Sequence, residues 1–176
     1  MATLRIDGSY GEGGGQILRS SVALSALTGK DMEIVNIRSK RDRCGLAAQH
    51  LTAVRGVAEL CGASLEGDEL GSTSLTFRPG EVLGGEYEFN VGTAGSVTLV
   101  LQACMLAAVH ADGPVTMTIR GGTNVRMSPP VDHYLNVLLP LLREMHVDVE
   151  LYALNSPFNC PHIISHRFSP LSLRSP

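Results

Sequence analysis

The chain has 176 residues, of which 44% are hydrophobic and 18% are charged, and its formal net charge is −3. These totals are typical of a globular chain with one or two domains, and they exclude a protein that binds nucleic acid through a strongly basic overall charge. The four cysteines stand far apart with no C-x-x-C pair, and no apolar leader opens the sequence. We therefore expect a cytoplasmic protein with free thiols.

The first half of the chain alternates strand and helix patterns. A short strand enters a glycine-dense loop at residues 8–14, and apolar residues then continue at helical spacing up to Gly29. A second helix carries one apolar stripe and stops at Gly62. In chain order, the strands predicted for this half are at 4–7, 32–38, 63–66 and 72–78.

The second half repeats this order. Gly95 and Arg120 stand 81 and 82 residues after Gly14 and Arg38, respectively. Strands are predicted at 86–91, 115–120 and 147–151, and helices at 97–109 and 131–145, the last kinked by its proline. The helix at 97–109 is apolar but too short to span a membrane, so we expect it to be buried.

This order of elements predicts an α+β fold, an α/β sandwich of tandem β-α-β-α-β-β repeats in which two helices pack on one face of each sheet. The first repeat covers residues 1–80. The second covers residues 81–151 and lacks its final strand, so we interpret it as truncated. Residues 152–176 are rich in proline and serine and contain no acidic residue, and we expect this tail to be disordered.

The glycine-dense loop is the first candidate binding site. Glycine lets a ligand approach the backbone closely, and the helix that follows offers unpaired amides and a positive dipole end. The spacing matches neither the dinucleotide fingerprint nor the Walker A pattern, so a merely structural turn is the alternative. Glu12 and Arg19 favour an anion site, because charge is rarely buried without a partner, although structural ion pairs would also explain them.

Three further features carry polar groups in notable places. Residues 38–43 contain three arginines and one lysine, which suit phosphate oxygens but are also typical of a solvated loop. Gln102 is the one strongly polar residue in an apolar helix, so we expect it to have a partner, either a ligand or an internal hydrogen bond. His50 shares the apolar side of its helix and is most simply a core histidine.

Several short runs occur in a fixed order between residue 4 and about residue 151. They are GEGGGQILR (11–19), IR (37–38), GLAAQHL (45–51), LTFRPG (75–80), GTAGS (92–96), LVLQ (99–102) and GGT (121–123). Together they closely resemble the RNA 3′-terminal phosphate cyclases.

The resemblance implies an ATP-dependent, AMP-forming ligase with a divalent metal, Mg²⁺ or Mn²⁺. Members of the family convert an RNA 3′-phosphate to a 2′,3′-cyclic phosphate: a histidine is adenylylated, AMP passes to the RNA 3′-phosphate, and the 2′-hydroxyl expels AMP. To such a reaction a protein contributes mainly positioning and charge neutralisation. RNA 3′-phosphate ends and ATP are the implied partners, with no DNA and no membrane.

The resemblance also implies roles for individual residues, one as a carboxylate and the others as ligands of ATP or phosphate. The metal or active-site carboxylate is Glu12, and the binding residues are Gly14, Arg19, Arg38, Arg41, Gln49 and Gln102. Of the two glutamines, Gln102 is the better candidate for contacting ATP.

The chain departs from the family beyond residue 151. None of the six histidines matches the nucleophilic histidine of the family, and its carboxy-terminal half is not recognisable. We therefore expect a fragment that cannot form the covalent adenylate alone and that a missing half could complete. Cys160, His162 and His166 lack a second ligand pair at zinc-finger spacing, so we expect no metal there.

Two other functions stay open. One is a non-catalytic, cyclase-like scaffold in ribosome assembly, although the intact run at 11–19 argues against a scaffold. The other is a free-standing module that binds RNA ends or nucleotides through the arginines without chemistry.

Overall fold

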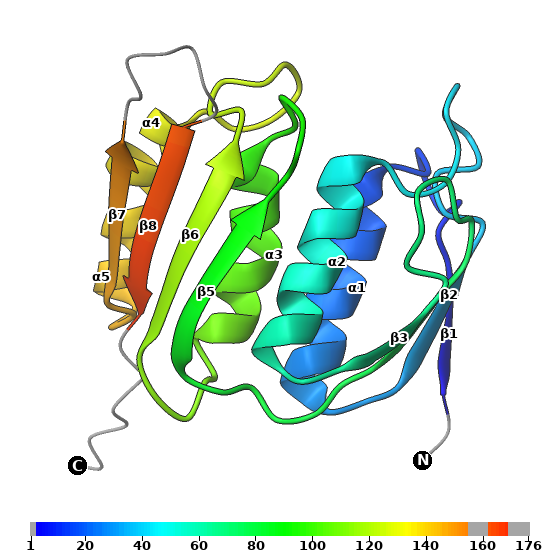
Figure 1. The fold of residues 1–176 in the computed structure, drawn as a ribbon, viewed down its shortest axis with the longest axis horizontal. Helices are drawn as coiled ribbons and strands as arrows, with labels where there is room; N and C mark the ends of the chain where they lie inside the picture. The colour runs from blue at the N-terminus through cyan, green and yellow to red at the C-terminus, as the bar shows by residue number, and fades with distance from the viewer. Residues whose placement is uncertain (1–2, 155–161, 169–176) are drawn as a thin grey trace.

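The computed structural model describes residues 3–154 and 162–168. Two four-stranded sheets form the outer layers, and the helices lie between them (Figure 1). The strand order is β1-β2-β4-β3 in the first sheet and β5-β6-β8-β7 in the second. The predicted α+β class, with helices on one face of each sheet, is confirmed.

In the first half, residues with positive φ angles end both α1 and β2. It contains β1 (Leu4–Asp7), α1 (Gly15–Thr28), β2 (Met32–Val35), α2 (Ala48–Leu60), β3 (Ser64–Glu66) and β4 (Leu75–Arg78). Gly29 ends α1 in the left-handed conformation, with φ of 63°, as the sequence predicted. β2 is shorter than the predicted strand at 32–38, because Asn36 and Arg38 have φ of 55° and 54°, which no strand accommodates.

The second half contains a long helical run with an irregular middle. Its elements are β5 (Gly85–Asn90), α3 (Val97–Ala108), β6 (Val115–Gly121), α4 (Val131–His133), the π-helical turn η1 (Tyr134–Leu138), α5 (Leu139–Glu144), β7 (Val149–Leu154) and β8 (His162–Phe168). α4, η1 and α5 follow one another without a break where one kinked helix was predicted. The π-helical turn lies just before Pro140, whose missing N–H disturbs the ordinary hydrogen-bond pattern.

The strand β8 corrects two expectations about the end of the chain. It pairs antiparallel with β6 and with β7, so the second sheet has the same order and strand directions as the first. The second unit is therefore not cut off at residue 151, and residues 162–168 of the tail form a strand instead of being disordered. The prediction of disorder rested on the average composition of residues 152–176, which is rich in proline and serine. It overlooked the run at 162–168, whose isoleucines and phenylalanine favour strands. The tandem repeat stays our interpretation of the shared order. Residues 155–161 and 169–176, with Cys160, lie outside the described residues.

One hydrophobic core crosses both halves. α3 lies beside both α1 and α2. At Gly56 of α2, an added Cβ would lie 2.8 Å from the Sγ atom of Cys104 in α3 and 3.5 Å from the ring of Phe89 in β5. The missing side chain of Gly56 therefore lets the two halves approach closely. Within the described part of the chain, no helix is both long and apolar enough to cross a membrane.

The helices α1, α2 and α3 all begin at the same end of the molecule, at the top of Figure 1. The loops that precede these helices meet there, although they come from distant parts of the sequence. This end of the fold therefore gathers the residues that the sequence marked as a candidate site.

Candidate anion-binding site

The glycine loop, residues 8–14, connects β1 to α1. Gly11 and Gly13 both have φ of 58°, a left-handed conformation that favours glycine. Gly14 precedes the first turn of α1, and no side chain caps the amides of that turn. These amides are therefore open to an anionic ligand at the positive end of the helix dipole.

The arginine loop, residues 36–45, packs against the glycine loop. The Nζ atom of Lys40 donates a hydrogen bond of 3.0 Å to the carbonyl oxygen of Gly11. Arg41 forms an ion pair of 3.3 Å with Glu12. The structure thus brings Glu12 and Arg41 together, but as partners of each other.

Arg19 is the most unusual charge in this region. It lies in the second turn of α1, and only 6% of its surface is exposed. Its guanidinium donates one hydrogen bond of 3.0 Å to Oε1 of Gln16, and its Nε atom has no partner among the described residues. None of the ion pairs in the described part of the chain involves Arg19. Burial lowers the pKa of Arg19, as expected for a cation without a counter-ion.

His50 lies against Arg19 at the start of α2. Its ring is only 5% exposed, and its Nδ1 atom accepts a hydrogen bond of 3.2 Å from the backbone N–H of Ala47. Its Nε2 atom faces Gly15, where an added Cβ would lie 2.1 Å away. Burial first, and then the charges of Arg38 and Arg19, lower the pKa of His50 to about 4. The imidazole is therefore neutral at pH 7, with its proton on Nε2.

The sequence interpretation of His50 as a core histidine was therefore incomplete. The residue is buried, as predicted, but it is buried within reach of the charges of two arginines of the candidate site, Arg19 and Arg38. Its place in the run GLAAQHL, next to Gln49, was the available signal.

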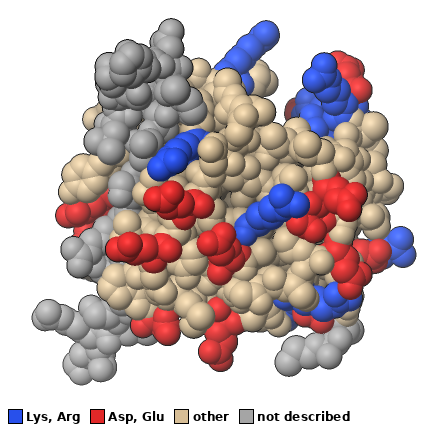
Figure 2. Space-filling view, in the orientation of Figure 1, with Lys and Arg blue, Asp and Glu red and all other residues tan. Residues whose placement is uncertain are grey.

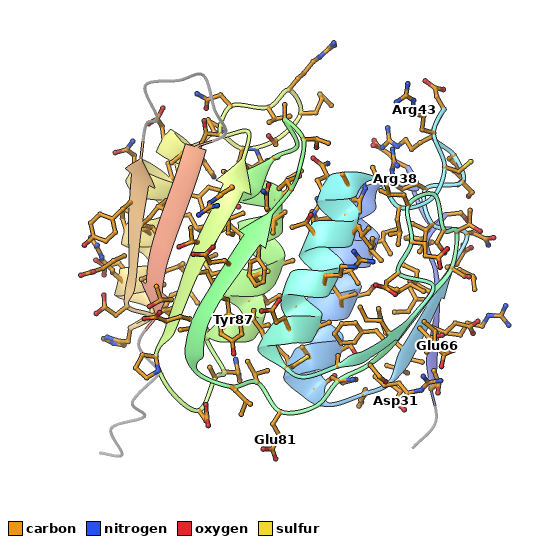
Figure 3. The ribbon with its side chains drawn as sticks, viewed as in Figure 1. Asp31, Arg38, Arg43, Glu66, Glu81 and Tyr87 are labelled. Atoms are coloured by element: carbon orange, nitrogen blue, oxygen red, sulfur yellow. The ribbon has the colours of Figure 1, made fainter. Side chains whose placement is uncertain are left out.

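Arg38 is half-buried at the beginning of the arginine loop (Figure 3). Its Nη1 atom donates a hydrogen bond of 2.9 Å to the carbonyl oxygen of Gly45, which closes the loop. Burial, followed by the neighbouring charge of Arg41, lowers the pKa of Arg38. Arg19 and Arg38 therefore both lie close enough to His50 for their charges to lower its pKa, and neither has a carboxylate paired to it among the described residues.

Gln49 connects the site to the second half of the molecule. Its Oε1 atom accepts a hydrogen bond of 3.1 Å from the backbone N–H of Ser96, which caps α3. This bond is internal and structural, and the sequence did not predict it for Gln49. Its predicted role in binding ATP or phosphate stays a prediction.

Tyr134 supports the same junction from η1. Its hydroxyl donates a hydrogen bond of 2.8 Å to the carbonyl oxygen of Thr98, and only 2% of the residue is exposed. Burial raises the pKa of Tyr134 to about 12, and the nearby positive charge of Arg19 acts in the opposite direction. Tyr134 thus places a neutral hydroxyl group near the buried guanidinium of Arg19.

Of the two partners that the sequence left open for Gln102, the internal hydrogen bond is not formed among the described residues. Gln102 is exposed on α3 and makes no hydrogen bond with them, so it needs no internal partner. The apolar helix misled the sequence argument, because one face of α3 is not fully covered: Leu99 is half-buried and Leu106 is 39% exposed. No described contact joins Gln102 to the arginines, and its role toward ATP stays a prediction.

The divalent metal implied by the resemblance finds few ligands in the described residues. No group of three His, Cys, Asp or Glu side chains gathers there. The side chain of Glu12 is 91% exposed and faces the guanidinium of Arg41 instead of a second carboxylate. These residues do not by themselves fit a metal site.

Charge is distributed unevenly over the surface. In Figure 2, carboxylates gather over the second sheet, whereas Lys and Arg side chains project from the upper rim, where the loops of the candidate site lie. Glu86, Glu88 and Glu150 are among the exposed carboxylates of that sheet. An anionic ligand is therefore attracted to the rim and not to the sheet.

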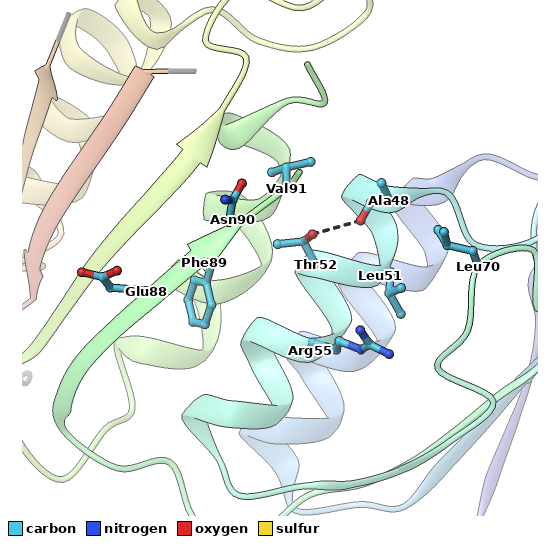
Figure 4. Close-up of a pocket in the computed structure, with 9 residues that line it drawn as sticks. All are labelled: Ala48, Leu51, Thr52, Arg55, Leu70, Glu88, Phe89, Asn90 and Val91. Atoms are coloured by element: carbon cyan, nitrogen blue, oxygen red, sulfur yellow. Dashed lines mark hydrogen bonds between the residues drawn. The ribbon is translucent and has the colours of Figure 1, made fainter. Parts of the chain in front are cut away.

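A groove of about 320 Å³ separates α2 from β5 (Figure 4). The charge of Arg55 within it is already neutralised by Asp68, at 2.8 Å. The groove therefore offers no free cation, and we distinguish it from the anion site. Its lining residues are Ala48, Leu51, Thr52, Arg55, Leu70, Glu88, Phe89, Asn90 and Val91.

Comparison with known proteins points to one family. The family described as RNA 3′-terminal phosphate cyclase matches residues 10–159. RNA 3′-terminal phosphate cyclases of Methanopyrus kandleri, Nitrosospira multiformis and Pyrococcus furiosus are 58%, 59% and 53% identical over 88%, 80% and 83% of this chain. The aligned part covers 44%, 40% and 43% of those relatives, so the chain spans less than half of their length.

Among solved structures, an EPSP synthase from Acinetobacter baumannii aligns with 96% of this chain and 48% of its own, at 10% identity and a TM-score of 0.40, which is too low to indicate a shared fold. The sequence matches are far stronger and agree with one another in name and in position. The chain belongs to the RNA 3′-terminal phosphate cyclase family.

Proposed function

We propose that this chain supplies the phosphate-binding part of an RNA 3′-terminal phosphate cyclase. The complete reaction consumes ATP, converts an RNA 3′-phosphate to a 2′,3′-cyclic phosphate, and releases AMP and pyrophosphate. The role of this chain is to bind and orient phosphoryl groups, and the covalent step belongs to a histidine outside the residues matched here. A divalent metal is part of the same proposal, but no step is assigned to Glu12 as its ligand.

The observation that carries the proposal is the buried, unpaired guanidinium of Arg19. Moving a charge out of water costs several kcal/mol unless a counter-charge and hydrogen bonds offset it. In the described part of the chain Arg19 has one hydrogen bond and no counter-charge. A phosphate oxygen would provide both, and a guanidinium binds two phosphate oxygens at once through its planar fork.

The surroundings of Arg19 fit the same ligand. The uncapped first turn of α1 adds amide donors and the positive end of its dipole. Arg38 adds a half-buried cation whose charge also reaches the neutral His50. Such preorganised donors stabilise charge that develops on a transferred phosphoryl group without having to rearrange.

Replacing Arg19 by methionine tests this function. We expect Arg19→Met to lower the affinity for a single-stranded RNA with a 3′-phosphate by about 10- to 150-fold, the value of a charge-assisted hydrogen bond or two, and to abolish the preference over the 3′-hydroxyl RNA. Fluorescence anisotropy of labelled oligonucleotides measures both affinities. Arg55→Ala, which removes an arginine already paired in the groove, is the matched control and should leave them unchanged.

Stability separates this role from a structural one. Because Arg19 is buried without a counter-charge, Arg19→Met should unfold in urea at the same or a higher concentration than the unsubstituted chain. A loss of about 3–5 kcal/mol, typical of a broken buried ion pair, would show that Arg19 is structural and would contradict the proposal. The intact mass after incubation with ATP and Mg²⁺ should show no added AMP on this chain alone.

A further inference from the structure

We propose that the single-stranded RNA that leads to the phosphate site runs over Tyr10, Lys40 and Arg43, with one base stacked on the ring of Tyr10. These three residues are called the strand surface below. The inference rests on the proposed function and adds to it the path of the RNA chain next to its terminal phosphate.

Tyr10 presents its ring to solvent from a loop that is held by several hydrogen bonds. The residue is 81% exposed, and its hydroxyl makes no hydrogen bond with the described residues. Its backbone is held at both ends: the N–H donates to the carbonyl of Asp7 at 3.2 Å, and the carbonyl accepts from the N–H of Gly13 at 3.0 Å. The preceding Ser9 donates two further hydrogen bonds, of 3.0 and 2.8 Å, to the Asp7 carboxylate. A base can therefore stack on this ring without the cost of ordering the loop first.

The two cations of the strand surface come from the arginine loop, which packs against the glycine loop that carries Tyr10. Lys40 is fixed over the glycine loop by its bond to the carbonyl of Gly11, the residue next to Tyr10. Arg43 is exposed at the outer part of the arginine loop (Figure 3). Neither forms an ion pair with the described residues, whereas Arg5, Arg41, Arg55, Arg78 and Arg120 all do. Their charges are therefore available for backbone phosphates.

The strand surface adjoins the phosphate site. A Cβ added at Gly15 would lie 3.1 Å from the Nη1 atom of Arg19. Tyr10 and Gly15 are five residues apart, so their Cα atoms are at most about 18 Å apart. A short single strand can reach from one to the other. The acidic second sheet repels an alternative path across that face, which leaves the cationic rim of Figure 2 as the favourable course.

Exposed aromatic rings together with basic side chains are a common means of binding a single strand. Bases stack on the aromatic face while lysine and arginine contact phosphates, and this recognition tolerates different sequences. The bases of a duplex are already stacked on one another, so the strand surface favours unpaired RNA.

Substitution of Tyr10 tests the inference. A single-stranded RNA with a 3′-phosphate, carrying 2-aminopurine at one of its last four positions, should lose fluorescence at one position when it binds, because the probe base stacks on Tyr10. Tyr10→Ala should abolish that loss and weaken binding about 5- to 150-fold. Tyr10→Phe keeps the ring, so it should retain both the loss of fluorescence and the affinity for RNA. Tyr152→Ala is the matched control, since Tyr152 is also exposed, at 56%, but lies on the acidic second sheet.

Salt dependence tests the cations. Arg43→Ala should reduce the slope of log K against log salt concentration by about 0.7, the value for one phosphate contact to a single strand. A nucleoside 3′-phosphate, too short to reach the strand surface, should bind equally well to the unsubstituted chain, Tyr10→Ala and Arg43→Ala.

The outcomes separate this inference from the proposed function. If the preference for a 3′-phosphate depends on Arg19 but RNA binding is indifferent to Tyr10, only the inference is wrong. The inference is also overturned if a blunt duplex binds as tightly as single-stranded RNA, or if Tyr10→Phe weakens RNA binding as much as Tyr10→Ala does. If no RNA binds to the unsubstituted chain, both fail.

Discussion

At the scale of single residues, the site depends on one charged and one neutral group that are both buried. Arg19 keeps its charge in a place where water cannot solvate it, and His50 beside it cannot become charged without repulsion from two arginines. The two effects support each other, because a neutral His50 can pack against Gly15 and leave the guanidinium free for a ligand. We therefore expect His50 to act as a positioning residue, whose protonation would place a third positive charge beside Arg19 and Arg38.

This arrangement predicts a pH dependence of stability. The pKa of His50 is about 4 in the folded chain against 6.5 when unperturbed. Between these pH values the unfolded chain binds a proton that the folded chain does not, so the free energy of unfolding falls as the pH is lowered from 6.5 to 4, by on the order of 3 kcal/mol. His50→Gln keeps an acceptor for the N–H of Ala47 but does not titrate. The decrease in its free energy of unfolding should therefore be smaller by that amount than the decrease in the unsubstituted chain. Urea unfolding at pH 7 and pH 4 measures the difference.

Other groups titrate over the same range, so the comparison between variants is the informative quantity. His110→Gln replaces an exposed histidine and should follow the unsubstituted chain. Parallel pH curves for His50→Gln and the unsubstituted chain would show that His50 is not held neutral by its surroundings.

At the scale of elements, the close approach of α2 and α3 is what joins the halves and places their loops together. Gly56 faces Cys104 in this contact, and the N–H of Ser96 binds Gln49 at the upper ends of the same helices. Glycine in a helix interior ordinarily destabilises it by about 1 kcal/mol relative to alanine. The lack of a side chain at this position instead permits the helices to touch.

A double-mutant cycle tests that contact. Gly56→Ala should destabilise the chain by about 1–3 kcal/mol in spite of its better helix propensity, because the new methyl group overpacks the interface. Adding Cys104→Ala removes the Sγ atom that it meets, so the double variant should be more stable than the sum of the single effects predicts, by at least about 0.5 kcal/mol. Gly113→Ala, whose Cβ meets no atom closer than 3.8 Å, should be nearly neutral. Strict additivity in urea unfolding would contradict the close packing.

At the scale of the whole molecule, the surface combines a cationic rim with apolar helix faces. Leu24 on α1, Leu106 on α3 and Leu141 on α5 are 51%, 39% and 57% exposed. Apolar side chains on neighbouring elements favour association, because burying them removes apolar surface from water. The net charge of −3 provides only weak repulsion between copies.

We therefore expect this chain to self-associate at micromolar concentrations. Leu24→Lys combined with Leu141→Lys should raise the monomer fraction in sedimentation velocity without lowering the urea midpoint. Leu70→Lys changes a leucine that is 68% exposed in the loop between β3 and β4, and should have little effect. A chain that is already monomeric, or equal effects of all three substitutions, would show that the helix faces do not drive association.

Much of the fold could be predicted from the sequence because its signals are local. Gly29 ends α1 through its own backbone conformation, and the apolar stripe of α2 records its buried face. The family, too, is recognisable from runs of a few residues. Local signals failed in two places. Positive φ angles at Asn36 and Arg38 end β2 earlier than predicted, and the average composition of the tail gave no sign of the strand β8.

The sequence by itself thus determined the order of elements as far as β7, the family and the residue types of the site. Only the tertiary structure decided that Glu12 faces Arg41 and Lys40 meets Gly11, each pair 29 residues apart, and that Gln49 binds Ser96 from 47 residues away. It also decided that Gln102 is exposed and that His50 is buried within reach of the charges of Arg19 and Arg38. The physical reason is that spacing along a chain sets which face a residue shares, whereas packing between distant elements sets which faces are covered and which charges are left without a partner.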